Sequence, residues 1–108
     1  MKLKYCVACV LTLLAASASA QSYPQRPVRL VVAVAAGGST DVMGRLFAAK
    51  LSERLGQQFV VDNRPGGSSM IGSEIVAKAQ PDGYTLLMAS ASFGTIGAMF
   101  SRVPFDLQ

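Results

Sequence analysis

A glycine pair, two hydroxyl residues and an aspartate form the stretch of this sequence that is best suited to bind a ligand. The stretch is Gly37-Gly38-Ser39-Thr40-Asp41, and it separates an apolar run from a helical pattern. A glycine-rich turn that opens a helix leaves backbone N–H groups free to hold an anion. Glycine also adopts the positive φ angles of tight turns, so the alternative is a turn that binds nothing.

Two better-known phosphate motifs are absent from this stretch. It lacks the G-x-G-x-x-G spacing of dinucleotide sites and the Gly-Lys-Ser/Thr ending of a P-loop. Asp41 suits the positive end of a helix dipole better than the role of a catalytic base. Ser39 or Thr40 can serve as the N-cap residue of the following helix.

Two further loops carry glycine and hydroxyl residues. The first is 62–69, in which Asn63 could bond its own turn and Arg64 is expected to be a solvated charge. The second is 90–92, whose serines could instead cap a helix. The candidate ligand-binding residues of these two loops are Gly66, Gly67, Ser68, Ser69, Ser90 and Ser92.

Alternating apolar runs and helical patterns position the three loops. We expect strands at 28–34, 59–61 and 84–89, and helices at 41–55, 70–79 and, more weakly patterned, 93–100. The first helix is indicated by an apolar stripe, which consists of Met43, Leu46, Phe47, Leu51 and Leu55. The second is indicated by Ile71, Ile75 and Ala79, which are spaced four apart, and it is followed by a turn at Pro81-Asp82-Gly83.

The order of these elements predicts an α/β fold, a βαβαβ unit with a parallel sheet. In such sheets ligands bind beyond the carboxyl ends of the strands. All three candidate loops follow strands, so we expect them to meet at one edge.

Composition limits the chemistry available. The first twenty residues have a basic start, a short apolar stretch and an Ala18-Ser19-Ala20 ending, which are typical of a secretory signal peptide cleaved between Ala20 and Gln21. Both cysteines lie in this leader, and the sequence has no histidine. Residues 21–108 therefore lack disulfides, thiolates and the commonest metal ligands, so we expect no cofactor.

The charge and the side chains present argue against two classes of function. The formal net charge is +4, of which Lys2 and Lys4 in the leader supply two, and the other basic residues form no run. We therefore expect no nucleic-acid partner. Without histidine, cysteine or a carboxylate pair, no catalytic constellation can be assembled, and an enzyme is not expected.

Several spaced motifs across residues 23–106 resemble one family. They are Y-P-x-R-P-V-R-L-V-V, G-G-S-T-D, L-G-Q-Q-F-V-V-D-N-R-P-G-G and I-G-S-E-I-V-A-K-A-x-P-D-G-Y-T-L-L-M. The chain resembles the extracytoplasmic solute-binding receptors of tripartite tricarboxylate transporters, also called Bug-type receptors. The resemblance implies a periplasmic receptor that captures a small carboxylate and presents it to a membrane carrier of one large and one small subunit.

The resemblance also assigns parts of this chain. It implies a type II periplasmic-binding-protein-like fold with two lobes that close on the ligand. Residues 37–41 match the first ligand loop of the family, 65–69 lie in the second, and 90–93 match the third. Family members are roughly three times longer than one small domain of this size. The resemblance therefore implies that residues 21–108 form a truncated half-lobe, part of the N-terminal lobe.

Two other hypotheses remain open at this stage. One is a secreted, doubly wound enzyme that binds a phosphate ester at 37–41, and the other is a non-functional truncated remnant. A three-stranded sheet with two or three short helices leaves one face and both edges thinly covered. We therefore expect the chain alone to be marginally stable and to bind carboxylates weakly.

Overall fold

Three parallel strands form the centre of the molecule. The structure, a computed structural model, describes residues 22–105, so the expected leader and its cleavage point lie outside the described residues. The strands are β1 (Val28–Val32), β2 (Phe59–Asn63) and β3 (Thr85–Met88), and they lie in the order β2-β1-β3. Both pairings are parallel. The predicted parallel α/β sheet is therefore confirmed.

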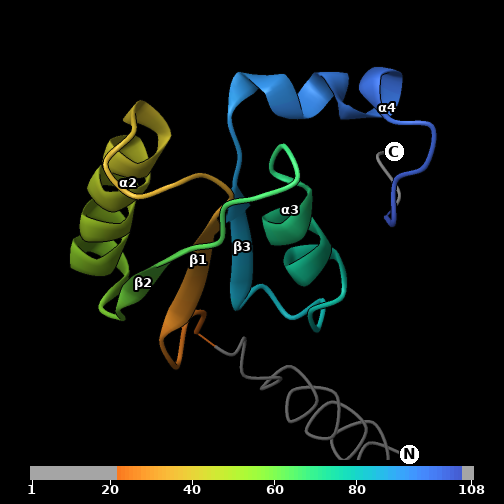
Figure 1. The fold of residues 1–108 in the computed structure, drawn as a ribbon. Coiled ribbons are helices and arrows are strands. Elements are labelled where there is room, and N and C mark those ends of the chain that lie inside the picture. The colour runs from red at the N-terminus through yellow and green to blue at the C-terminus, as the bar shows by residue number, and fades with distance from the viewer. Residues whose placement is uncertain (1–21, 106–108) are drawn as a thin grey trace, which may run out of the picture.

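Helices connect the strands in the predicted order. Helix α2 (Ser39–Leu55) joins β1 to β2, and α3 (Met70–Ala77) joins β2 to β3. They lie on opposite sides of the sheet (Figure 1). The third helical segment begins earlier than predicted, as a 3-10 helix η1 (Ala91–Thr95), and continues as α4 (Ile96–Met99). No helix within residues 22–105 is long and apolar enough to cross a membrane.

The main core lies between the sheet and α2. Alternate residues of β1 point toward this helix, and their side chains meet Phe59 and Ala48. The β1 members are Val28, Leu30 and Val32, each 6% exposed or less. Because side chains alternate across a strand, Arg29 and Val31 lie on the opposite face of the sheet.

Helix α2 turns a different face to the sheet from the one that its apolar stripe predicts. The residues it buries are Asp41, Gly44 and Ala48, whereas Leu46 is 58% exposed and Phe47 50% exposed. A Cβ atom added at Gly44 would lie 3.1 Å from Val32 Cγ2, so the helix sits close to the sheet. The stripe correctly predicted a helix, but it was wrong as a guide to the buried face.

Helix α3 approaches the other face of the sheet in the same way. Its buried residues are Gly72 and Ser73, whereas Ile71 is 51% exposed. A Cβ atom at Gly72 would lie 2.8 Å from Ala33 Cβ and 2.9 Å from the carbonyl oxygen of Arg64. This helix therefore packs against the end of β1 through a position that only glycine fits.

The turn predictions hold in part. Gly83 has a φ of 79°, as expected for the turn that precedes β3. In the first loop Gly37 has a φ of 91°, but Gly38 is extended, with a φ of −79° and a ψ of 170°. Only the first glycine of the pair is therefore required by the backbone conformation.

We expect Gly72→Ala to destabilise the chain. The added methyl group overlaps backbone and Cβ atoms, and overpacking of this kind costs about 1–3 kcal/mol. The gain in helix propensity, about 1 kcal/mol, does not offset a cost at the upper end of that range. Urea unfolding followed by circular dichroism measures the difference. The matched control is Gly94→Ala, because a Cβ atom there has no neighbour within 4 Å. Equal midpoints for the two variants would contradict this packing.

Candidate functional site

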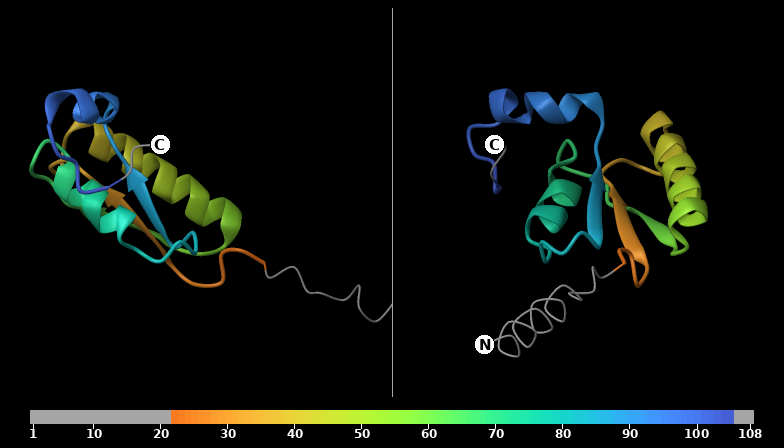
Figure 2. Two further views of the ribbon diagram at one scale, coloured as in Figure 1. Left: turned by 90° about the vertical axis from the view of Figure 1, so that its right-hand side faces the viewer. Right: turned by 180° about the vertical axis from the view of Figure 1, so that it is seen from behind.

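The three candidate loops leave the sheet at the same edge. In Figure 1 the connections that follow β1, β2 and β3 all emerge beyond the carboxyl ends of the strands. The first loop leads into α2, the second into α3 and the third into η1. The views in Figure 2 agree with this arrangement. The structure therefore places the predicted site residues on one edge, as expected for an α/β sheet.

The first loop presents backbone amides. The N-cap residue of α2 is Gly38 and it makes no side-chain capping bond, so the prediction that Ser39 or Thr40 caps the helix was wrong. Both residues lie in the first helical turn, where amides have no intrahelical acceptor. The amide of Val42 is the first to donate within the helix start, to the carbonyl of Gly38 at 3.0 Å.

The side chain of Asp41 bonds the loop that precedes the helix. Its carboxylate Oδ2 accepts hydrogen bonds from the amide of Gly37 at 2.9 Å and from Arg45 Nε at 3.0 Å. Its Oδ1 accepts from Asn63 Nδ2 at 2.8 Å. The side chain is only 4% exposed. The carboxylate is therefore turned into the protein, while the backbone amide of this residue remains at the start of the helix.

The sequence suggested that Asn63 bonds its own turn, but the structure shows other partners. Its Nδ2 donates to Asp41 and also to the carbonyl of Val34 at 3.2 Å, and its Oδ1 accepts from Arg45 Nη2 at 3.1 Å. The side chain thus joins the end of β2 to the first loop. Sequence reasoning missed both Asn63 and Arg45 at this position. The available signals were the i, i+4 spacing of Asp41 and Arg45, and a polar residue at the carboxyl end of a strand.

These contacts stabilise the ionised form of Asp41. Hydrogen bonds from Gly37, Asn63 and Arg45 lower its pKa from 3.8 to about 2. Burial acts in the opposite direction but is outweighed. The carboxylate is therefore charged throughout the neutral pH range.

The second loop holds an unusual backbone. Four consecutive residues have positive φ angles: Gly66 at 120°, Gly67 at 55°, Ser68 at 54° and Ser69 at 73°. Left-handed backbone costs roughly 1–2 kcal/mol at a residue with a side chain. Ser69 is buried, and its carbonyl accepts both the amide and the hydroxyl of Ser73, at 3.2 and 2.8 Å. These bonds to α3 help to hold the turn.

The third loop brings two hydroxyls together. Ser90 Oγ and Ser92 Oγ lie 2.7 Å apart, and Thr95 Oγ1 donates to the carbonyl of Ser92 at 2.7 Å. Ser90 is the N-cap residue of η1 but makes no side-chain capping bond. The two serines therefore bond each other, and the capping alternative does not apply to Ser90.

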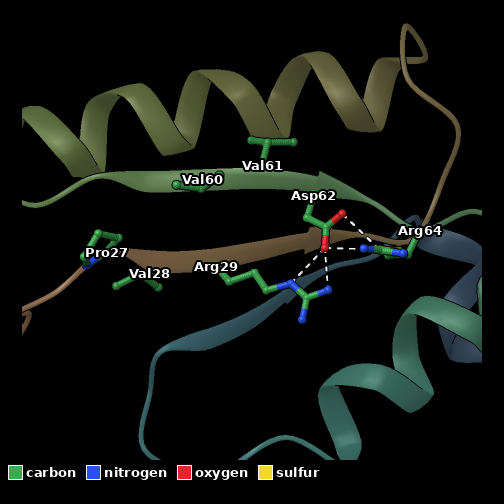
Figure 3. Close-up of a pocket in the computed structure, with 7 residues that line it drawn as sticks. All are labelled: Pro27, Val28, Arg29, Val60, Val61, Asp62 and Arg64. Carbon is green, nitrogen blue, oxygen red and sulfur yellow. Dashed lines mark hydrogen bonds and ion pairs between the residues drawn. The ribbon is translucent and has the colours of Figure 1, made fainter.

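A separate open hollow of about 410 Å³ lies on the sheet face beside β1 and β2, and it reaches the start of the second loop at Arg64 (Figure 3). In it the side chains of Arg29 and Arg64 both point to Asp62, with Arg29 Nε 2.8 Å from Oδ2 and Arg64 Nε 3.0 Å from Oδ1. The pKa of Asp62 is lowered, chiefly by the hydrogen bonds from Arg29. Arg64 is half exposed and ion-paired within the protein. None of the candidate ligand-binding residues lines this hollow.

The described part of the chain offers little for metal chemistry. Within residues 22–105, no group of three or more aspartate, glutamate, histidine or cysteine side chains is placed to hold a metal ion. The arrangement that the loops do offer is a set of amide and hydroxyl donors at a helix start, which suits an anionic ligand.

Comparisons with known proteins agree on one family. The model of the tripartite tricarboxylate transporter family receptor matches residues 43–108. A UPF0065 protein of Bordetella bronchiseptica is 44% identical over 100 residues, which are 92% of this chain and 30% of that protein. The protein BugT of Bordetella pertussis is 49% identical over 79 residues, 73% of this chain and 24% of that protein.

Solved structures are also similar to this chain. A periplasmic transporter is matched with a TM-score of 0.73 at 40% identity, over 78% of this chain and 29% of that one. An R. palustris protein with adipate is matched with a TM-score of 0.59 at 52% identity. MatC from Rhodopseudomonas palustris with bound malate is matched with a TM-score of 0.58 at 40% identity. Each of these two matches covers 60% of this chain and 22% of the other. The chain spans less than a third of the length of these relatives.

The lowered pKa of Asp41 predicts a pH-dependent loss of stability. A carboxylate whose pKa falls from 3.8 to about 2 on folding stabilises the protein above pH 3.8, and this contribution is lost as the pH falls toward 2. We expect Asp41→Asn to lower the urea unfolding midpoint at neutral pH. The difference in midpoint between the wild type and the variant should become smaller below about pH 4.

The control for this experiment is Glu53→Gln. Glu53 is exposed and pairs with Lys50 on the surface of α2. Its removal should leave the midpoint nearly unchanged across the same pH range. A gap between wild type and Asp41→Asn that stays constant as the pH falls would contradict the assignment.

Proposed function

Because the chain belongs to the tripartite tricarboxylate transporter receptor family, we propose that it binds a small carboxylate as part of an extracytoplasmic solute receptor. The observation that carries the proposal is the placement of three polar strand-end loops at one edge, with the start of α2 held by a buried carboxylate. The family consists of receptors, so the mechanism we propose is capture without chemistry.

Backbone amides supply the main contacts in this proposal. The amides of Gly38–Asp41 lie at the amino end of α2, where the helix dipole favours an anion. The amides of Gly66–Ser69 lie in the left-handed turn before α3. The amide of Gly37 takes no part, because it donates to Asp41.

Hydroxyl groups complete the proposed site. They belong to Ser39, Thr40, Ser90 and Ser92. Hydroxyls can both donate and accept, so they suit a ligand that carries carboxylate and hydroxyl groups. Two relatives were solved with malate and with adipate, which supports a dicarboxylate as the ligand class.

The family match also supports a role in transport. The receptor would present its ligand to membrane subunits of a tripartite carrier, one large and one small. The alternative of a secreted enzyme that binds a phosphate ester at Gly37–Asp41 has weaker support, because Asp41, the only carboxylate of that stretch, faces inward.

We expect Ser39→Pro to weaken binding by removing one amide donor. Ser39 is the first helical residue of α2, a position where proline is favoured, and the extended backbone of Gly38 suits the residue before a proline. A hydrogen bond to a charged group contributes about 1.5–3 kcal/mol, so the affinity for malate should fall roughly tenfold or more. An NMR titration with millimolar malate measures this.

The matched control is Ser39→Ala, which removes the hydroxyl and keeps the amide. Its loss of affinity should be clearly smaller than that of Ser39→Pro. Unfolding midpoints of the two variants check that the helix persists. Equal affinities for Ser39→Pro and the wild type would show that this amide does not contact the ligand.

We also expect export with removal of residues 1–20. Expression of the full chain in a Gram-negative host, followed by intact mass measurement of the periplasmic fraction, should give a protein that starts at Gln21, with or without cyclisation of that residue. A mature protein that keeps Met1, or one acylated on Cys6 or Cys9, would contradict the assignment of a cleaved leader.

A further inference from the structure

We propose that Asp41 is a positioning residue whose carboxylate holds the first loop and the end of β2 in one fixed relation, without contacting the ligand. The effect that we expect on ligand affinity rests on the function proposed above. The effect that we expect on the two loops does not, since it depends only on contacts within the protein.

Both carboxylate oxygens of Asp41 accept hydrogen bonds from the protein itself. Oδ2 is occupied by the amide of Gly37 and by Arg45 Nε, and Oδ1 by the side-chain amide of Asn63. These donors come from the loop before α2, from α2 itself and from β2. With the side chain only 4% exposed, an approaching anion meets the amides of the helix start and not this carboxylate.

Asn63 is the second half of the link. Both hydrogens of its Nδ2 are used, one toward Asp41 and one toward the carbonyl of Val34 in the first loop. The ladder between β1 and β2 ends just beyond this residue, with the amide of Arg64 donating to the carbonyl of Val32 at 2.8 Å. Where backbone pairing stops, the side chains of Asn63 and Asp41 continue to join the two segments.

The link connects the two proposed sets of anion donors. The amides of Gly38–Asp41 follow Gly37 directly, and the second loop follows Asn63 through Arg64 and Pro65. Fixing Gly37 relative to Asn63 therefore fixes where both loops begin. A preorganised site loses less entropy when the ligand binds, so the link should raise affinity without making a contact of its own.

An asparagine at position 41 cannot make the same set of bonds. It has one acceptor oxygen in place of two, whereas three donors face the side chain. Its NH₂ group would also confront either the Asn63 amide or the donors of Gly37 and Arg45. Asp41→Asn is therefore nearly isosteric but breaks the link.

The experiment compares full chains by NMR, as wild type, Asp41→Asn and Asp62→Asn. Asp62 is the matched control, because its carboxylate also accepts hydrogen bonds from arginine, here Arg29 and Arg64, but none of its bonds within residues 22–105 reaches the first loop. The readouts are hydrogen exchange of the Gly37 amide, the side-chain NH₂ resonances of Asn63, and the affinity for malate as probe.

We expect Asp41→Asn to speed exchange of the Gly37 amide roughly tenfold or more, the change that corresponds to loss of a charge-assisted hydrogen bond. The Asn63 NH₂ resonances should shift, and affinity for malate should fall at least severalfold. Asp62→Asn should leave the Gly37 exchange rate unchanged, and it should shift the Asn63 side-chain NH₂ resonances far less than Asp41→Asn does. Similar behaviour of the two variants would overturn the proposal.

A second variant distinguishes loss of the link from general unfolding of the protein. Asn63→Ala removes the link from the side of β2 but leaves the bond from Gly37 to Asp41, so Gly37 exchange should stay slow while affinity for malate falls. The double variant should lose little more affinity than either single one, because both break the same link. Additive losses would overturn the proposal. If the wild type bound no malate, the proposed function would fail, and the exchange and resonance data would still decide the link.

Discussion

The carboxylate of Asp41 is the constraint on which the ligand-binding edge of this fold depends. A charged group that is almost fully buried is stable only when its hydrogen-bonding capacity is satisfied. Here the donors are Gly37, Arg45 and Asn63, which belong to three different segments. The hydrogen bonds that satisfy this one charge therefore join a loop, a helix start and a strand end, while the adjacent residues Gly38 and Ser39 are exposed.

The order of the elements followed from the sequence, and the faces they bury did not. Apolar runs and helical spacing predicted every strand and both long helices to within two residues at most ends. The hydrophobic stripe of α2 nevertheless lies largely on its outer side, and Phe47 is half exposed. The helix contacts the sheet through Gly44 and Ala48, because small residues allow close approach. A hydrophobic pattern records which side chains are apolar, but not how near two elements can come.

The candidate site was predictable to a similar degree. Its location followed from the rule that ligands bind beyond the carboxyl ends of parallel strands, and the glycine and serine content of the loops marked the residues. The position of Asn63 at a strand end was a signal, but its partners Asp41 and Val34 could not be predicted, because they are distant in sequence. The left-handed backbone at Ser68 and Ser69 was equally hidden, since serine carries no signal for positive φ. In the sequence, the positive φ angles of this turn were indicated only by the two preceding glycines, Gly66 and Gly67.

The most direct test of the account is a map of backbone amide shifts in the ¹⁵N-labelled chain as malate is added. Carboxylate capture by the strand-end loops predicts that the perturbed amides cluster at Gly38–Asp41, Gly66–Ser69 and Ser90–Ser92. The hollow lined by Arg29, Asp62 and Arg64 offers exposed guanidinium groups on another face of the sheet, and it is the natural competitor for an anion. Perturbations confined to that hollow, or none at millimolar malate, would contradict the account.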